Sequence, residues 1–161
     1  MSLSGGCQCG AVRFRVTGEI RHTSLCHCRM CQKAFAAPFG AFASVAIASM
    51  EWTRGERKRF QSSNAVARGF CGDCGTPLTF EAAIGGKNIA LAICAFDDPD
   101  QLPPQRQSDI EARVAWLPHV GDLPIPSAED VAVQAAKYGP RTSFQHPDHD
   151  TDAHDTDIGP G

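Results

Sequence analysis

Apolar and polar residues alternate along several short segments in the first two thirds of the chain. Within residues 11–16, Val12, Phe14 and Val16 alternate with arginines, which is the pattern of a half-buried strand. Further strands are expected at 20–25, 38–47, 57–61, 65–70, 77–81 and 88–94. Residues 84–87 are typical of a hairpin turn between the last two of these strands. The pattern therefore predicts a mainly β fold.

The remaining segments predict a little helix and one more strand. Residues 29–35 contain good helix formers and predict a short helix. The best helix candidate spans residues 128–138, with Ser127 as its N-cap. Residues 111–116 are expected to add a last strand, with Trp116 covering the core. A short C-terminal helix thus accompanies the expected sheets.

Length and composition favour one small domain. The chain has 161 residues and a mass of 17.2 kDa, and 42% of its residues are hydrophobic, which is enough for a core. We expect this domain to occupy residues 1–140. Residues 141–161 are rich in histidine and aspartate and have almost nothing to bury, so we expect a disordered tail.

The charge and hydropathy of the chain argue against several classes of protein. The formal net charge of −3 and the pI of about 6.0 do not favour binding to nucleic acid or anionic membranes. No apolar run approaches the roughly 20 residues that a membrane helix requires. Residues 1–6 do not have the pattern of a secretory signal. We therefore predict a cytoplasmic protein, in which clustered thiols favour metal over disulfides.

Close spacing of cysteines is the strongest chemical signal. Seven of the eight cysteines lie in the groups Cys7-x-Cys9, Cys26-x-Cys28-x2-Cys31 and Cys71-x2-Cys74. Such groups are typical of zinc sites. Seven ligands divide into four, which close a tetrahedral site, and three, which leave one position open. Gly72 and Gly75 are expected to supply the positive φ of a tight metal-binding turn.

Cys7 and Cys9 lie more than sixty residues before Cys71 and Cys74, and a structural zinc typically joins such distant segments. We therefore predict a structural zinc at these four residues. The three remaining thiols, Cys26, Cys28 and Cys31, can face a common point from one short turn. Zinc held there would accept a fourth soft ligand and hold an incoming thiol as a thiolate, ready to add to a small carbonyl compound.

Other readings of the three-cysteine group remain open at this stage. Cys94 or His27 could close the site, although Cys94 ends an apolar strand and predicts core packing. His27 is expected to lie behind the ligands or at the surface. The three thiols could also be plain buried cysteines, iron–sulfur ligands, or a redox group that forms disulfides.

Three segments together resemble the glutathione-dependent formaldehyde-activating enzyme family, whose domain centromere protein V shares. They are Gly6–Phe14 (GCQCGAVRF), Cys26–Lys33 (CHCRMCQK) and Arg68–Leu78 (RGFCGDCGTPL). The resemblance implies a zinc-containing β-tent fold of small twisted sheets joined by cysteine turns. It implies structural zinc at Cys7, Cys9, Cys71 and Cys74 and active-site zinc at Cys26, Cys28 and Cys31. Cys94 departs from the pattern, because a small residue, usually glycine, is expected there.

The resemblance also implies a reaction, the joining of formaldehyde to glutathione to give S-(hydroxymethyl)glutathione. The leading hypothesis is therefore a zinc-dependent carbon–sulfur lyase that condenses a glutathione-like thiol with formaldehyde or a related small electrophile. Arg29 and Lys33 are candidates to contact the carboxylates of glutathione. The alternatives are a non-catalytic, zinc-stabilised binding module and a redox or metal-handling protein.

Overall fold

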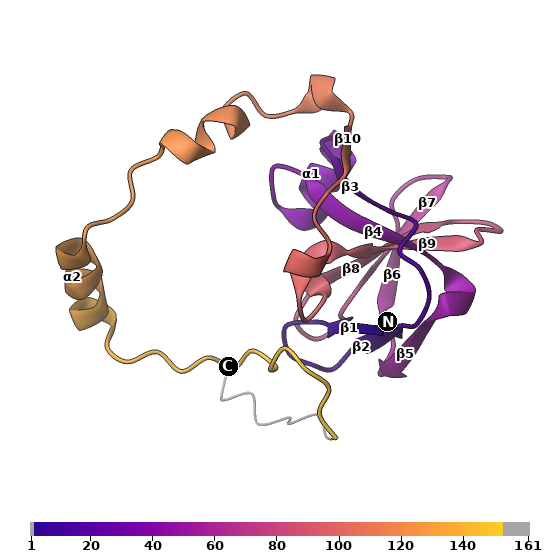
Figure 1. Ribbon diagram of the computed structural model, residues 1–161, viewed down its shortest axis with the longest axis horizontal. Coiled ribbons are helices and arrows are strands. Elements are labelled where there is room, and N and C mark those ends of the chain that lie inside the picture. The colour runs from indigo at the N-terminus through magenta and orange to yellow at the C-terminus, as the bar shows by residue number, and fades with distance from the viewer. Residues whose placement is uncertain (1, 153–161) are drawn as a thin grey trace.

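Two β-sheets form the body of the protein in the computed structural model, which describes residues 2–152 (Figure 1). The smaller sheet has the antiparallel order β1-β2-β5 and the larger one the order β10-β3-β4-β9-β8-β7-β6. The small sheet contains β1 (Leu3–Gly6), β2 (Arg13–Val16) and β5 (Met50–Arg54). The large sheet contains β3 (His22–Cys26), β4 (Gly40–Ala46), β6 (Lys58–Gln61), β7 (Val66–Phe70), β8 (Pro77–Ala82), β9 (Asn88–Ala92) and β10 (Arg106–Ser108). The mainly β prediction is confirmed.

Helices are few and short. The helix α1 (Arg29–Phe35) follows β3, and α2 (Ala128–Tyr138) begins at a capping box formed by Ser127 and Asp130. Both lie where the sequence predicts them. Short 3-10 turns are η1 (Ile47–Ser49), η2 (Ile93–Ala95), η3 (Pro99–Gln101), η4 (Ile110–Ala112) and η5 (Leu117–Asp122). The α2 helix buries no residue and stands away from the sheets (Figure 1).

The core lies where the two sheets meet. Phe14 of β2 is fully buried and packs edge-to-face on Phe96 at 5.0 Å between ring centroids and on Trp52 at 6.1 Å. Leu78 and Leu91 from the large sheet complete the same cluster. The buried residues Cys7, Cys9 and Cys71 belong to this cluster too, so these cysteines lie at the edge of the core.

Seven predicted strands are present, and three further strands lie outside the predicted ranges. β1 is Leu-Ser-Gly-Gly and β10 is Arg-Gln-Ser, and neither alternates in polarity. β1 pairs with β2, and β10 pairs in parallel with β3. The third, β5, is Met-Glu-Trp-Thr-Arg, whose alternation in polarity and burial is a strand signal that the sequence interpretation missed. Partner strands supply the order that β1 and β10 do not encode locally.

The strand predicted at residues 111–116 is wrong. The chain forms η4 and a turn there, and Trp116 is 57% exposed instead of covering the core. Asp109, directly after β10, adopts a φ of 55°, which breaks the extended backbone and turns the chain into η4 instead of into another strand. No helix between residues 2 and 152 has both the length and the apolar character needed to cross a membrane.

The C-terminal tail contacts the small sheet within the described residues. Asp150 forms ion pairs with Arg13 at 2.8 Å and Arg15 at 2.7 Å, and the His146 amide donates to the Gln8 carbonyl at 2.8 Å. The limits of the predicted domain and the disorder predicted for residues 141–161 stay predictions, and residues 153–161 lie outside the described part. These contacts nevertheless place part of the tail against the loop that carries Cys7 and Cys9.

Candidate metal centres

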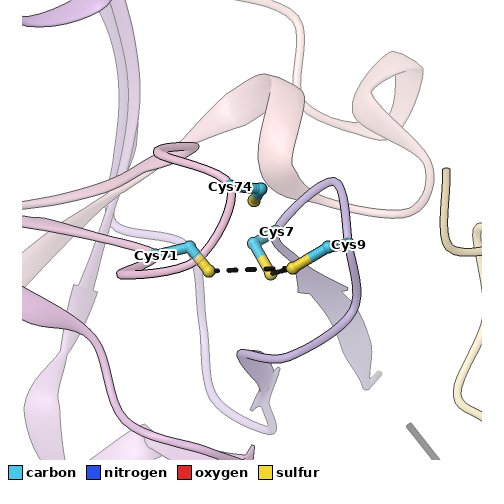
Figure 2. Close-up of side chains that lie close together, drawn as sticks. All are labelled: Cys7, Cys9, Cys71 and Cys74. Atoms are coloured by element: carbon cyan, nitrogen blue, oxygen red, sulfur yellow. Dashed lines mark hydrogen bonds between the residues drawn. The ribbon is translucent and has the colours of Figure 1, made fainter. Parts of the chain in front are cut away.

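Four sulfur atoms converge at the junction of the two sheets. The Sγ atoms of Cys7, Cys9, Cys71 and Cys74 all lie within 4.8 Å of one another. Figure 2 shows that two loops carry them toward a common space. The Sγ–Sγ distance is 3.5 Å from Cys7 to Cys9 and 3.8 Å from Cys9 to Cys71. Three of these thiols are buried and Cys74 is the most exposed. The structure thus brings together the four cysteines that the sequence analysis grouped, and their role as metal ligands stays a prediction.

The two loops have matching backbone geometry. In the first, the Gly10 amide donates to the Cys7 carbonyl at 3.0 Å, and Gly10 has a φ of 77°. In the second, the Gly75 amide donates to the Cys71 carbonyl at 3.1 Å, and Gly75 also has a φ of 77°. Glycine adopts this conformation without steric cost. The prediction of positive φ is thus confirmed for Gly75 and is wrong for Gly72, because Gly75 alone closes the second turn.

Backbone amides donate to the sulfur atoms of both loops. The Val12 amide lies 3.2 Å from Cys7 Sγ, and the Asp73 amide lies 3.4 Å from Cys71 Sγ. Burial raises the pKa of Cys9 and of Cys71. Burial alone would raise the pKa of Cys74, but hydrogen bonds, above all those with Thr76, lower it to about 6. Four close sulfurs with N–H donors fit a tetrahedral metal ion of the zinc type, which would displace the remaining protons.

A second group of sulfurs forms where β3 passes into α1. Cys26 ends β3, Cys28 is the N-cap of α1, and Cys31 lies in its first turns. The Cys31 amide donates to Cys28 Sγ at 3.4 Å. The three Sγ atoms lie within 4.8 Å of one another, and Cys31 is only 1% exposed. A strand that ends directly at a helix N-terminus therefore presents three thiols to one point, and the group fits a metal ion with one position left over.

A cavity of about 500 Å³ borders this three-cysteine group. Cys26 and Cys31 line it, together with the aromatic rings of Phe42 and Phe80. Asp109, the residue that follows β10, also lines it and accepts a hydrogen bond from Cys26 Sγ at 3.2 Å. Hydrogen bonds from Ser108 and then Cys26 lower the pKa of Asp109. A small molecule in this cavity would meet two sulfurs and one carboxylate.

The three thiols differ in their surroundings. Burial raises the pKa of Cys26 to about 12, and it also raises the pKa of Cys31. Burial acts in the same sense on Cys28, but hydrogen bonds from the Cys31 backbone and from the neighbouring thiols lower its pKa. Of the three thiols, Cys28 is therefore the one whose surroundings favour the thiolate, since it accepts a backbone hydrogen bond at the N-terminus of α1.

Cys94 does not approach the three-cysteine group in the described residues. It lies in η2 with its side chain exposed, and it lines a cavity beside Cys7 and Cys74. The prediction of core packing is therefore wrong. β9 ends at Ala92, and the turn of η2 buries Ile93 and Ala95 while it directs Cys94 outward.

His27 lies between two of the cysteines but is not grouped with them. Its side chain is fully buried, and Nε2 lies 2.9 Å from Gln107 Oε1. The surface position that the sequence allowed is thus wrong, and the buried position behind the ligands is the one observed. Gln32 donates to the His27 carbonyl at 2.8 Å, which anchors the turn that carries the thiols.

Arg29 and Lys33 both lie exposed on α1, and neither is among the residues that line the 500 Å³ cavity. Arg29 donates to Gln32 Oε1 at 3.1 Å. Their role toward a substrate stays a prediction. The sequence interpretation did not assign roles to two residues that contact the sulfurs, Asp109 and Arg68. Arg68 stands in the Arg-Gly-Phe-Cys run that leads into Cys71, whereas Asp109 has no local signal.

Known proteins resemble this chain in both sequence and fold. The family model described as glutathione-dependent formaldehyde-activating enzyme matches residues 2–111, a stretch that contains both cysteine groups. An uncharacterized lyase of Schizosaccharomyces pombe is 36% identical over 84 residues, which make up 52% of this chain and 60% of that protein. The match thus spans less than two thirds of that relative. The crystal structure of a Rhodobacter sphaeroides protein has a TM-score of 0.52 at 17% identity, over 65% of this chain and 99% of that chain, and so shares the fold.

Proposed function

This chain belongs to the glutathione-dependent formaldehyde-activating enzyme family, and we propose that it is a zinc-dependent carbon–sulfur lyase. It joins a glutathione-like thiol to formaldehyde or a related small electrophile. The observation that carries the proposal is the unequal setting of the two cysteine groups. One is a set of four sulfurs, and the other is a set of three that borders a cavity of about 500 Å³.

The four-cysteine group has a structural role in this proposal. Cys7 and Cys9 precede β2 of the small sheet, while Cys71 and Cys74 lie between β7 and β8 of the large sheet. An ion bound there ties the two sheets together at the edge of the core. Four thiolates complete a tetrahedral shell, so this ion has no position for substrate.

The three-cysteine group has the catalytic role. Zinc bound by Cys26, Cys28 and Cys31 would supply Lewis acidity that lowers the pKa of an incoming thiol. Two of these sulfurs, those of Cys26 and Cys31, lie in the cavity wall beside the apolar rings of Phe42 and Phe80. Asp109 lies in the same wall and offers a carboxylate that accepts a hydrogen bond from an entering thiol or hydroxyl group.

The reaction balances without a redox partner. The thiol loses its proton, its sulfur forms a bond to the carbonyl carbon, and the carbonyl oxygen takes up a proton to become a hydroxyl group. Glutathione carries two carboxylates, and Arg29 and Lys33 are exposed on the helix that holds Cys31, where a carboxylate that extends out of the cavity could meet them. Neither a membrane nor nucleic acid is required, and the cytoplasm would supply the thiol.

The proposal is tested by the rate at which ¹³C-formaldehyde and glutathione exchange with S-(hydroxymethyl)glutathione, measured by NMR exchange spectroscopy. The full chain is expected to accelerate the exchange above the spontaneous rate, and Cys28→Ser is expected to abolish the acceleration. Cys94→Ser, which alters a thiol outside both groups, serves as the matched control and keeps the wild-type rate. A full chain that carries two zinc ions and leaves the spontaneous rate unchanged would instead favour the non-catalytic binding module.

A further inference from the structure

Arg68 is a buried cation with no carboxylate partner among the described residues. It lies in β7 and is 7% exposed, and its Nε and Nη1 atoms are buried without a hydrogen-bond acceptor. Its Nη2 atom donates to Cys31 Sγ at 3.5 Å, and the guanidinium lies over the ring of Phe80 at 5.3 Å from the centroid. Arg68 therefore directs its charge at one thiol of the three-cysteine group.

The other buried arginine shows how this chain normally treats such a charge. Arg13 is 3% exposed and pairs with Asp97 at 2.7 Å and with Asp150 at 2.8 Å. A buried charge without a partner is costly, so a sequence that keeps one must offset it elsewhere. At Arg68 the group available within reach is the sulfur of Cys31.

Charge counting identifies what would offset Arg68. Three protonated thiols are neutral and do not neutralise a guanidinium. A divalent zinc ion with three thiolates carries a net charge of −1, and a fourth thiolate brings it to −2. A cation beside Cys31 therefore matches the metal-loaded form of the group, and matches the form that has bound a thiolate better still.

A substrate carboxylate is a poorer partner for Arg68. The Nε and Nη1 atoms have almost no accessible surface, and Arg68 is not among the described residues that line the 500 Å³ cavity. Arg68 does line a separate cavity of about 290 Å³ beside Phe35 and Phe60, but its unpaired nitrogens stay buried there too. The cavity at the thiols presents the ring of Phe80, on which the guanidinium rests.

We propose that Arg68 is a positioning residue that offsets the negative charge of the metal–thiolate group at Cys26, Cys28 and Cys31 and thereby sets its affinity for a fourth, anionic ligand. This inference rests on metal binding by the three-cysteine group, which is part of the proposed function. Among the described residues no arginine or lysine is hydrogen-bonded to a sulfur of the four-cysteine group, where Cys7 and Cys71 accept from backbone amides instead. The inference therefore concerns the three-cysteine group alone.

The test uses the full chain loaded with Co²⁺, whose sulfur-to-metal charge-transfer absorption reports each bound thiolate. Wild type, Arg68→Met and Arg68→Lys are titrated with 2-mercaptoethanol and with 3-mercaptopropionate. Arg68→Met is expected to lower the affinity for both thiols by about tenfold and to the same extent. Arg68→Lys is expected to restore most of the affinity. Arg59→Met removes an exposed arginine of β6 and is expected to leave both affinities unchanged.

Each other outcome overturns the inference. A loss confined to 3-mercaptopropionate would assign Arg68 to the ligand carboxylate, and unchanged affinity for both thiols would make Arg68 a packing residue. If Arg68→Met does not fold, Arg68→Gln replaces it in the same titration. If the wild-type chain takes up only one Co²⁺, the three-cysteine group does not bind metal, and both this inference and the proposed function are wrong. Normal thiol binding that Arg68 does not affect would remove this inference alone.

Discussion

The two cysteine groups use the same ligand chemistry in opposite surroundings. The four-cysteine group joins two loops of matching geometry and is held by backbone amides and core packing. The three-cysteine group comes from one continuous turn and has charged side chains on either side, Arg68 at Cys31 and Asp109 at Cys26. A site that must only hold metal can rely on the backbone. A site that must also exchange a ligand needs an open coordination position and nearby charge.

The buried arginines extend this contrast. Arg13 lies beside the four-cysteine group, where it lines a cavity with Cys7 and Cys74, and two carboxylates neutralise it. Arg68 lies beside the three-cysteine group and has no carboxylate within the described residues. The charge of Arg13 is thus neutralised by the protein itself. The charge of Arg68 would be neutralised only by an anion at the three-cysteine group.

The largest expected effect is the loss of stability in Cys71→Ser. Structural zinc contributes on the order of 10 kcal/mol in small domains, and removing one buried ligand forfeits much of this. We expect Cys71→Ser to be insoluble or to melt far below wild type, as measured by circular dichroism. Cys94→Ser is the control and should melt as wild type does. A Cys71→Ser chain with an unchanged melting temperature would contradict the structural role of the first group.

Cys28→Ser is expected to separate function from folding. The three-cysteine group does not join distant segments, so its loss should lower the melting temperature much less than Cys71→Ser does. The rate of thiol–formaldehyde exchange should fall to the spontaneous rate. Elemental analysis should find one zinc ion fewer per chain. Equal destabilisation by the two substitutions would show that the groups do not divide their roles.

Asp97→Asn tests how firmly the surroundings of the first group are held. The Asp97 carboxylate is largely buried and accepts from Arg13 and from Ser4, so its loss leaves a buried guanidinium partly unpaired. The free energy of unfolding should fall by about 3 kcal/mol. Asp150 is the second partner of Arg13, and its side chain is 35% exposed. Asp150→Asn should therefore lower the free energy of unfolding by at most about 1 kcal/mol. Urea denaturation measures both, and a larger effect at Asp150 would give the tail an essential role.

A smaller effect is expected from alkaline pH on the metal-free chain. Burial raises the pKa of Cys9 and of Cys71 above the ordinary value of 9.0, so the folded state retains protons that the unfolded state releases. Their contribution to stability is present below pH 9.0 and declines as the pH rises above it. The lowered pKa of Cys74 acts in the opposite sense, but only up to about pH 9.0, where the unfolded thiol titrates. Thermal melts of the chelator-treated protein should therefore show a melting temperature that falls as the pH rises from about 10 to about 11.

The metal-loaded chain should behave in the opposite sense. Bound thiolates must be protonated before zinc leaves, so its stability falls as the pH is lowered. Its melting temperature should change little over the alkaline range in which the metal-free protein is destabilised. If both forms lost stability together on the alkaline side, the cysteines would not be the groups that titrate.

Local sequence determined much of this protein because its strongest signals are local. Alternation predicts β2 and the central strands, helix formers and a capping residue predict α1 and α2, and cysteine spacing predicts both groups of sulfurs. In each case a few neighbouring residues carry the whole signal: a period of two, a cap, or thiols separated by one or two positions.

Only the tertiary structure decided what surrounds those sulfurs. Asp109 reaches Cys26 because β10 pairs in parallel with β3. Arg68 of β7 reaches Cys31 of α1 although β8 and β9 separate β7 from β4, the strand on which α1 packs. The exposure of Cys94 follows from the turn of η2, which no local pattern encodes. Spacing along the chain could specify which sulfurs lie together. The charged side chains beside them come from segments some forty to eighty residues away, and only the tertiary fold brings them into contact.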